Sequence, residues 1–320
     1  MADILYIVVP CYNEESVLGE TSARLKIKMQ GLIAARRIAP ESKVLFVDDG
    51  SRDKTWDMIA SLHHADSLFS GVKLAGNRGH QNALMAGLMT AKELADVTIS
   101  MDADLQDDID CVDRFLDKYA DGCDIVYGVR SDRKSDTAFK RGTAQLFYKI
   151  MAGLGVNIVY NHADYRLMSK RALEGLARFR EVNLFLRGIV PLIGYKTDTV
   201  EYERGERFAG ESKYPLRKML SFAWDGVSSF SVRPIRMITV LGFVVFAVSL
   251  CLMVYSLIVK LLGHTVPGWS TLMISIWLLG GLQLLALGVI GEYIGKIYGE
   301  VKARPQFIIE TVLDENSLCH

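Results

Sequence analysis

The sequence predicts an α/β fold with a mostly parallel sheet, followed by two helices that cross a membrane as a hairpin. In residues 4–129, short apolar runs alternate with amphipathic segments, which is typical of a parallel sheet flanked by helices. Acidic residues directly follow two of these runs. In an open sheet of this kind, ligands bind at the carboxyl ends of the strands. Residues 237–259 and 261–291 contain no Asp, Glu, Lys or Arg, which indicates two membrane spans.

Length and composition narrow the class of protein. A chain of 320 residues has room for a domain of about 200 residues and a further part. Its 37 basic residues balance 37 acidic ones, so no overall positive field favours a nucleic-acid partner, and we expect none. The five cysteines form no Cys-X-X-Cys pair, and we expect them to be reduced rather than paired or bound to zinc.

Short runs rich in apolar residues predict five strands in the first 130 residues, of which the first is apolar throughout. We expect Pro10 to end the first run and Arg130 to follow the last. The runs cover residues 4–9, 43–47, 71–75, 97–101 and 124–129.

Segments with helical spacing of apolar residues lie between and after these strands. They cover residues 15–37, 53–64 (with Asp53 as the cap), 82–94, 109–119 and 140–153. Residues 201–212 are polar and contain glycine, which predicts a mobile loop. Residues 216–232 mix basic and large apolar side chains, which favours a helix in the membrane interface over a core helix. Polar and apolar residues alternate weakly in residues 306–312, which predicts a further strand. This strand could pair with the sheet of a neighbouring subunit.

The two uncharged runs also predict how the chain is oriented. Each exceeds the roughly 20 residues needed to cross a bilayer, whereas buried core helices, the alternative, seldom go so long without a charge. The turn at residues 262–268 lacks Lys and Arg, and Lys260 can reach the headgroups. Basic residues flank the hairpin on its other side: Arg217, Lys218, Arg233, Arg236, Lys296, Lys302 and Arg304. The positive-inside bias therefore places both ends in the cytoplasm of a multi-pass cell-membrane protein.

We expect four parts in chain order. They are a cytoplasmic catalytic domain, juxtamembrane amphipathic helices, two transmembrane helices and a cytoplasmic tail, at residues 1–214, 215–235, 236–295 and 296–320.

Residues 101–107 read Met-Asp-Ala-Asp-Leu-Gln-Asp, directly after an apolar strand. Asp102, Asp104 and Gln106 can each supply oxygen to one Mg²⁺ or Mn²⁺ ion, and such cations share their ligands between carboxylates and phosphates. A solvated acidic turn would be the better interpretation if this motif stood alone. The motifs at residues 10–14 and 48–51 accompany it, and the set predicts a nucleotide-sugar site and glycosyl transfer.

Asp107, Asp108 and Asp110 come next, and we expect them to be helix-start residues that favour the positive end of the helix dipole.

Asp48 ends the second strand, and its carboxylate can accept the imide proton of a uracil. Tyr12 and Glu14 would then contact the nucleoside, while Asp49 and Ser51 shape the turn and cap the next helix. A dinucleotide-binding fold also uses a strand-ending acid, but the sequence at residues 10–14 replaces its glycine-rich phosphate turn.

Basic residues cluster where phosphates would lie, although each alone is more often a surface charge. Arg130 at a strand end and Lys213 are the ones that we expect to bind phosphate. We expect His80 and His162 to be polar loop residues without a metal. The basic cluster comprises Arg130, Arg133, Lys134, Lys140, Arg141, Arg204, Arg207 and Lys213.

Taken together, the motifs resemble those of the metal-dependent, inverting GT-A glycosyltransferases of family 2 that charge polyprenyl phosphates. Dolichyl-phosphate mannose synthases and bactoprenol glucosyltransferases belong to this family. The last three motifs and the two spans are most similar to the bacterial bactoprenol branch. The motifs are PCYNE at 10–14, DDGS at 48–51, DADLQ at 102–106, Arg130, DYRLMS at 164–169, GESK at 210–213 and GEYIG at 291–295.

The resemblance implies a GT-A fold and a role for each matching residue. The metal would be held by Asp102, Asp104 and Gln106, and the reaction centre would include Asp164, as a base or a positioning group, with Asp104 and Arg166. The uridine and the phosphates would be bound by Pro10, Tyr12, Glu14, Asp48, Asp102, Arg130, Arg141, Arg207 and Lys213.

The expected reaction is inverting transfer of a sugar from a UDP-sugar to undecaprenyl phosphate. Glucose is the first expectation, ahead of N-acetylglucosamine, galactose or an aminoarabinose derivative. A processive polysaccharide synthase is the alternative, but it should carry a Gln-X-X-Arg-Trp motif and further spans, which the sequence lacks. A non-catalytic scaffold should have lost the acidic pair. The apolar spans and the tail strand would suit a homotetramer.

Overall fold

The computed structural model describes residues 2–130, 162–182, 185–203, 233–262 and 268–314. The chain forms two compact units. The eight strands seen in these residues belong to the first unit, and the second contains two long helices.

The first unit is built on an eight-stranded sheet with the order β7-β5-β6-β4-β1-β2-β3-β8. Its central strands β4, β1, β2 and β3 are parallel, so their carboxyl ends meet at one edge. Strand β6 is antiparallel to both β4 and β5, β7 is parallel to β5, and β8 is antiparallel to β3. This confirms the five predicted strands and the mostly parallel sheet. The bounds are β1 Leu5–Cys11, β2 Lys43–Asp48, β3 Phe69–Leu74, β4 Val97–Ser100, β5 Ile125–Arg130, β6 His162–Ser169, β7 Thr197–Tyr202 and β8 Ile309–Leu313.

Pro10 does not end the first strand, contrary to the prediction. Strand β1 continues through Pro10 to Cys11, which lies opposite Asp48 of β2. The ladder with β4 stops at Val8, so beyond this residue β1 has a strand partner on one side only. A proline is tolerated where one side of a strand needs no N–H donor.

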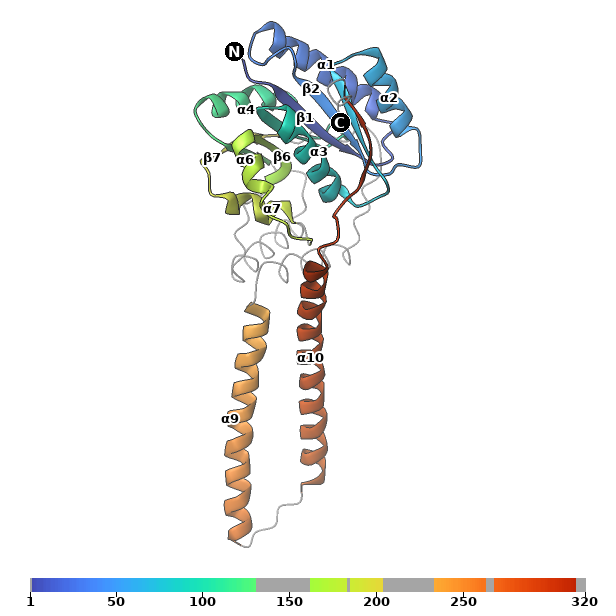
Figure 1. Ribbon diagram of the computed structural model, residues 1–320. Coiled ribbons are helices and arrows are strands. Elements are labelled where there is room, and N and C mark those ends of the chain that lie inside the picture. The colour runs from blue at the N-terminus through green and yellow to red at the C-terminus, as the bar shows by residue number, and fades with distance from the viewer. Residues whose placement is uncertain (1, 131–161, 183–184, 204–232, 263–267, 315–320) are drawn as a thin grey trace. The chain divides into compact units, whose positions relative to one another are not determined.

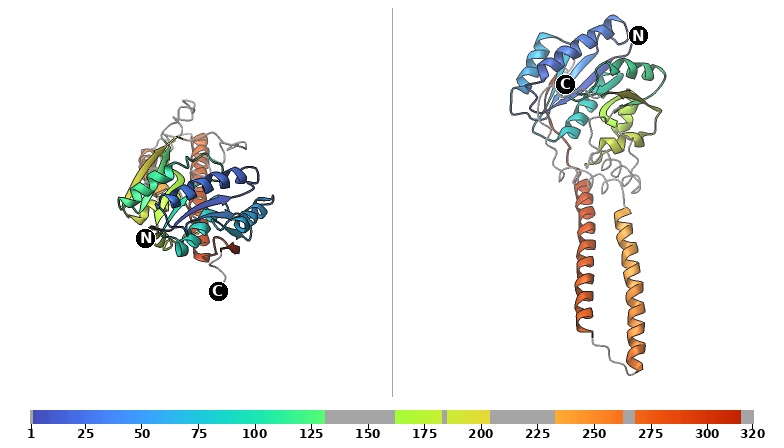
Figure 2. Two further views of the ribbon diagram at one scale, coloured as in Figure 1. Left: turned by 90° about the horizontal axis from the view of Figure 1, so that it is seen from above. Right: turned by 180° about the vertical axis from the view of Figure 1, so that it is seen from behind.

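Helices cover both faces of the sheet (Figures 1 and 2). Leu25 of α1, Ile59 of α2 and Phe115 of α4 pack in one core with alternate residues of β1. Helix α3 packs on the opposite face, where a Cβ at Gly87 would lie 2.5 Å from Val8 Cγ1. The bounds are α1 Leu18–Ala34, α2 Thr55–Ala65, α3 His80–Leu94, α4 Cys111–Ala120, α6 Lys170–Leu176, α7 Leu186–Ile189 and the 3₁₀ helix η1 Val190–Ile193.

The C-terminal tail returns to this sheet as strand β8 (Figure 1). The predicted strand at residues 306–312 is therefore present, but its partner is β3 of the same chain rather than a neighbouring subunit. The backbone N–H of Ala75 also donates to Ile308 O at 2.9 Å, so the pairing continues past the end of β3.

The second unit contains α9 (Arg233–Leu261) and α10 (Trp269–Lys302), which run side by side as a hairpin (Figures 1 and 2). Large apolar side chains such as Phe243 and Leu278 are 72% and 71% exposed. Within the described residues, Leu278–Lys302 is the helical segment long and apolar enough to cross a bilayer. Helices that are apolar on every side are typical of membrane spans, in agreement with the predicted hairpin.

Several predicted segments lie partly or wholly outside the described residues. These are the helices at 140–153 and 216–232, and residues 204–212 of the predicted loop. The loop prediction was wrong at its start, because Glu201 and Tyr202 belong to β7, whose pairing with β5 extends to Tyr202.

Candidate active site

Hydrogen bonds join the loops that follow β1 and β2. The backbone N–H of Asn13 donates to Ser51 Oγ at 2.9 Å, and that of Arg52 donates to Asn13 Oδ1 at 2.9 Å. Asn13 has a φ of 55°, a left-handed conformation that asparagine tolerates better than most residues. The backbone N–H of Glu14 donates to Thr55 Oγ1 at 2.9 Å. The two predicted nucleoside motifs therefore form one edge, on which Tyr12 is 42% exposed.

Asp48 is the last residue of β2, lies opposite Cys11 of β1 and is fully buried. Burial raises the pKa of its carboxyl group, and the hydrogen bonds from Ser51 and the charge of Lys73 oppose this rise. The Ser51 N–H lies 3.3 Å from both carboxylate oxygens. This carboxylate is thus a fixed acceptor at the ligand edge of the sheet.

Asp49 anchors the loop that precedes α3. Its carboxylate accepts the backbone N–H groups of Arg78 at 2.6 Å and Gly79 at 2.9 Å. Gly50 has a φ of 68°, and a Cβ there would lie 2.6 Å from Asn77 N, so this loop packs directly on the β2 turn. Asp49 therefore shapes a neighbouring loop as well as its own turn.

The acidic loop follows β4. The backbone N–H of Gln106 donates to Asp104 Oδ1 at 3.2 Å, and Leu105 between them has a φ of 59°. Burial and the charge of Asp107, with smaller contributions from Asp164 and Asp104, raise the pKa of Asp102 to about 6, although His80 lowers it. Crowded carboxylates of this kind are stabilised by a bound cation.

These residues fit a hard divalent cation in the type of their donor atoms. Asp102 and Asp104 offer carboxylate oxygens, and Gln106 is buried beside them with 8% of its surface exposed. In the part of the chain that the structure describes, no three His, Cys, Asp or Glu side chains form a metal-binding cluster. Phosphate and water oxygens would therefore have to complete the shell, as they usually do for Mg²⁺.

Asp107 is not a helix-start residue, contrary to the prediction, because α4 begins only at Cys111. It is 3% exposed, accepts the Tyr202 hydroxyl at 2.6 Å and accepts the Asp102 N–H at 3.3 Å. Arg130 Nε donates to the same Tyr202 hydroxyl at 3.3 Å, which places Arg130 beside the acidic loop. Asp110, by contrast, lies at the N-terminal boundary of α4, as predicted.

Asp164 on β6 lies between two arginines. Arg166 Nη2 donates to its Oδ1 at 2.6 Å, and Arg187 donates from Nη2 to Oδ2 at 3.1 Å and from Nε to Oδ1 at 3.4 Å. Burial raises the pKa of Asp164, but the charges of Arg187, Arg166 and His80 outweigh it and hold the pKa well below its usual range. Asp164 is therefore a stable anion and a weak proton acceptor.

His80 belongs to this site, although the sequence predicted a polar loop residue. It is the first residue of α3, and its Nε2 lies 3.6 Å from Asp102 Oδ1 and 3.7 Å from Asp164 Oδ2. The imidazole thus lies within 4 Å of both the predicted metal carboxylate and the predicted reaction-centre carboxylate.

Arg187 is the second residue that sequence reasoning missed. No local motif marks it, because it reaches Asp164 only through the tertiary fold. Arg141, Arg207 and Lys213 lie outside the described residues, as do Arg133, Lys134, Lys140 and Arg204, so their phosphate roles stay predictions.

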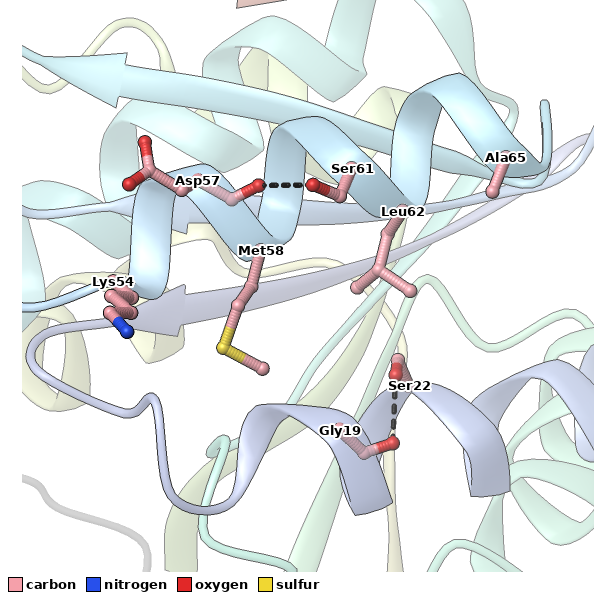
Figure 3. A pocket seen from close by; sticks show the side chains of 8 residues that line it. All are labelled: Gly19, Ser22, Lys54, Asp57, Met58, Ser61, Leu62 and Ala65. Carbon is pink, nitrogen blue, oxygen red and sulfur yellow. Dashed lines mark hydrogen bonds between the residues drawn. The ribbon is translucent and has the colours of Figure 1, made fainter.

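Hollows in the described part of the first unit include one near the site and one away from it. One, of about 520 Å³, adjoins the acidic loop and includes Gln106 and Asp107 in its lining. The other, of about 370 Å³, lies between α1 and α2, where Met58 and Leu62 point toward α1 (Figure 3). The Ser22 and Ser61 hydroxyls in that groove donate to backbone oxygens of their own helices. No residue of this groove belongs to the site described above.

Comparison with known proteins agrees with this arrangement. The sequence pattern of Glycosyl transferase family 2 matches residues 6–176, and that of the GtrB C-terminal hairpin matches residues 233–297. The chain is 57% identical over 315 residues to the uncharacterized glycosyltransferase YkoT of Bacillus subtilis, covering 98% of this chain and 94% of that one. It is 38% identical over 307 residues to the SfII prophage-derived bactoprenol glucosyl transferase of Shigella flexneri, covering 95% and 96%.

A mannosyltransferase from Pyrobaculum calidifontis, PcManGT, solved with GDP-Man and Mn²⁺, is 15% identical, with a TM-score of 0.45 and coverage of 95% of this chain and 86% of that one. The family match spans more than half of this chain, and the Shigella relative matches it almost end to end. The chain therefore belongs to glycosyltransferase family 2, with a GT-A catalytic fold followed by a GtrB-type transmembrane hairpin.

Proposed function

We propose that this protein transfers a sugar, with glucose as the first candidate, from a UDP-sugar to undecaprenyl phosphate with inversion of the anomeric centre. One observation carries the proposal: the bactoprenol glucosyl transferase relative is 38% identical across 95% of this chain. The likeness therefore includes both the catalytic unit and the hairpin, and a lipid acceptor accounts for the presence of the hairpin.

The donor nucleoside is assigned to the edge formed by the β1 and β2 loops. The buried Asp48 carboxylate would accept the uracil imide proton, because a fixed buried acceptor discriminates well between bases that can and cannot donate. The exposed Tyr12 ring would pack on the nucleoside, with Pro10 and Glu14 completing the pocket.

Asp102, Asp104 and Gln106 are assigned to Mg²⁺ or Mn²⁺, which when bound would neutralise the diphosphate and the charge on departing UDP. Arg130 is proposed to bind the donor phosphates, since it lies next to Asp107 and Tyr202. Arg141, Arg207 and Lys213 are proposed to contact donor or acceptor phosphates on the strength of the sequence motifs.

At the reaction centre, an oxygen of the lipid phosphate forms a bond to the anomeric carbon as the bond from that carbon to the UDP oxygen breaks. The attacking oxygen is already anionic near neutral pH, so no strong base is needed. The low pKa of Asp164 supports a positioning role, with Arg166 and Arg187 holding the carboxylate in place. Orientation and charge neutralisation would then supply most of the rate.

We assign the two helices to the cell membrane as a multi-pass hairpin and the catalytic unit to the cytoplasmic side. The apolar surfaces of α9 and α10 support the first assignment, and the excess of Lys and Arg outside the hairpin turn supports the second. The same proposal divides the chain after residues 214, 235 and 295 into the catalytic domain, the juxtamembrane helices, the transmembrane helices and the tail. We also propose a homotetramer as the assembly.

The test is to incubate the purified full chain in detergent with Mg²⁺ or Mn²⁺, undecaprenyl phosphate and a panel of UDP- and GDP-sugars. Mass spectrometry should find a lipid carrying one added sugar from a single donor. A saturating chelator should abolish its formation, and undecaprenol without the phosphate should not react. Turnover that withstands the chelator would overturn the metal assignment, and equal use of water-soluble alcohols would overturn the acceptor. A polymeric product would instead indicate a processive synthase.

A further inference from the structure

We propose that Gln81 is a positioning residue for the reaction centre, because its side chain holds the short helix that brings Arg187 to Asp164. This role rests on the proposed function, which places Asp164 beside the reacting groups. Nothing in the sequence connects Gln81 with Asp164, and the connection is visible only in the fold.

The contact that carries the proposal joins the start of α3 to the start of α7. Gln81 Oε1 accepts the backbone N–H of Leu186 at 3.0 Å, although the two residues are 105 positions apart. Leu186 is the first residue of α7 and is fully buried. The first N–H groups of a helix have no acceptor within the helix, and a buried N–H without a partner is costly. Gln81 supplies this acceptor from another element.

Helix α7 is only four residues long before it continues into η1, so contacts from other elements help to fix where it begins. A single helical turn has too few internal hydrogen bonds to fix its own position. Its second residue, Arg187, makes two contacts with Asp164, at 3.1 Å and 3.4 Å. A guanidinium with this two-point geometry requires its backbone to be placed accurately.

The other arginine on Asp164 has no such requirement. Arg166 lies two positions from Asp164 on the same strand, and its backbone is fixed by pairing with Ser100 and Tyr127. The strand alone therefore sets the Arg166 contact, whereas the Arg187 contact requires the helix to be held. Gln81 should affect the second contact and leave the first unchanged.

The element that carries Gln81 is itself firmly held. The Asp49 carboxylate accepts the N–H groups of Arg78 and Gly79 immediately before α3. His80, adjacent to Gln81, lies 3.7 Å from Asp164 Oδ2. The start of α3 thus connects the turn after Asp48, where the uridine is proposed to bind, with the groups around Asp164.

The experiment is a double-mutant cycle between Gln81→Met and Arg187→Met in the transfer assay. Methionine keeps the length of the glutamine side chain and removes the acceptor. We expect Gln81→Met to lower kcat roughly 3- to 10-fold, the usual effect of losing one hydrogen bond, while KM for the donor stays within about twofold. Because Gln81 acts through Arg187, adding Gln81→Met to Arg187→Met should cause no further loss.

A second readout does not depend on activity. Hydrogen exchange at the Leu186 amide should be faster in Gln81→Met than in the wild-type protein, because the amide loses its acceptor. Gln30→Met, at an exposed position on α1, is the matched control and should change neither kcat nor this exchange rate.

The outcomes separate the two proposals. Suppose that the wild-type protein is active. If Gln81→Met has normal kcat, or if the kcat losses of Gln81→Met and Arg187→Met multiply in the double variant, the role of Gln81 is overturned and the proposed function still holds. A wild type with no transfer to any lipid phosphate overturns the proposed function and this role together, even if exchange at Leu186 responds as expected.

Discussion

Lys43 and Asp314 form a buried ion pair, with 2.7 Å between Lys43 Nζ and Asp314 Oδ1 and side chains that are 9% and 2% exposed. Asp314 directly follows β8, whereas Lys43 begins β2. The Tyr6 hydroxyl, 3.4 Å from Asp314 Oδ2, provides a further donor. The last described residue of the tail is therefore fixed in the catalytic unit by a charge contact as well as by strand pairing.

Lys43→Met should destabilise the protein strongly, because it leaves the Asp314 carboxylate buried without its cation. Breaking one partner of a buried pair costs about 3 kcal/mol or more of unfolding free energy. Thermal unfolding in detergent should show this as a clear fall in the transition temperature. Arg24→Met is the control, since the Arg24–Glu20 pair is 52% and 39% exposed and should contribute less than about 1 kcal/mol. Equal shifts for the two variants would contradict the prediction.

Gly50→Ala should damage both stability and donor binding. The left-handed φ of 68° strains any side chain, and the new Cβ would meet Asn77 N at 2.6 Å. We expect a loss of about 1–3 kcal/mol in unfolding free energy and weaker UDP binding by calorimetry, because the turn after Asp48 must shift. Gly31→Ala, inside α1 with nothing within 4 Å of its Cβ, should instead stabilise by about 0.5–1 kcal/mol. A harmless Gly50→Ala variant would show that this turn is adaptable.

Asp104→Asn should lower turnover roughly a hundredfold or more while the protein remains folded, because the amide removes a charge from the proposed cation site. Circular dichroism and the transfer assay together measure this. The control is Asp110→Asn in the following segment, where the carboxylate is exposed and pairs with Lys28 at 2.8 Å. If Asp104→Asn retained normal turnover, Asp104 would not be a metal ligand.

Arg187→Met should shift the acid side of the activity profile toward higher pH. Removing a positive charge beside Asp164 favours its protonated form, so the pKa of Asp164 rises and the carboxylate is neutralised at a less acid pH. A pH–rate profile from acid to neutral conditions checks the direction. Lys118→Met, which removes a cation paired with Asp198 on the surface, should leave the profile unchanged. A profile for Arg187→Met that coincides with the wild-type profile would show that the ionised Asp164 is not required.

Lys213→Ala should weaken the apparent affinity for the lipid acceptor more than that for the nucleotide, since we assign this lysine to the acceptor phosphate. Steady-state KM values for the two substrates measure the difference. The opposite pattern would move Lys213 to the donor side.

The central fold could be predicted from sequence because the strands β1 to β5 are short segments rich in apolar residues, separated by segments with helical spacing. Strands β6 and β7 were not predicted as strands. In β6, the polar residues Asp164 and Arg166 interrupt the apolar pattern, although in the fold their side chains are only 13% and 1% exposed. In β7, the residues Thr197, Asp198 and Thr199 read as a surface segment, and pairing with β5 at the sheet edge makes it a strand.

The place of the strand-end motifs could be predicted, because Asp48 ends β2 and Asp102 follows β4 as expected, whereas the roles of both residues stay predictions. The remaining members were not predictable, because their roles arise from contacts between distant segments. The sequence of Asp107 and its neighbours predicts the start of a helix, but the hydroxyl of Tyr202, 95 positions later, donates to its carboxylate in the interior. His80 acquires its neighbours only when α3 packs beside β4 and β6. No spacing rule predicts such contacts.

Strand β8 has a consequence for how the two units remain associated. Around the hairpin, the chain leaves the catalytic unit before α9 and re-enters it after α10, so both ends of the hairpin are covalently joined to that unit. A protease that cut once between β7 and α9 would leave two fragments that β8 still holds together. After that single cut, the two fragments can separate only if the whole edge strand β8 is displaced from β3.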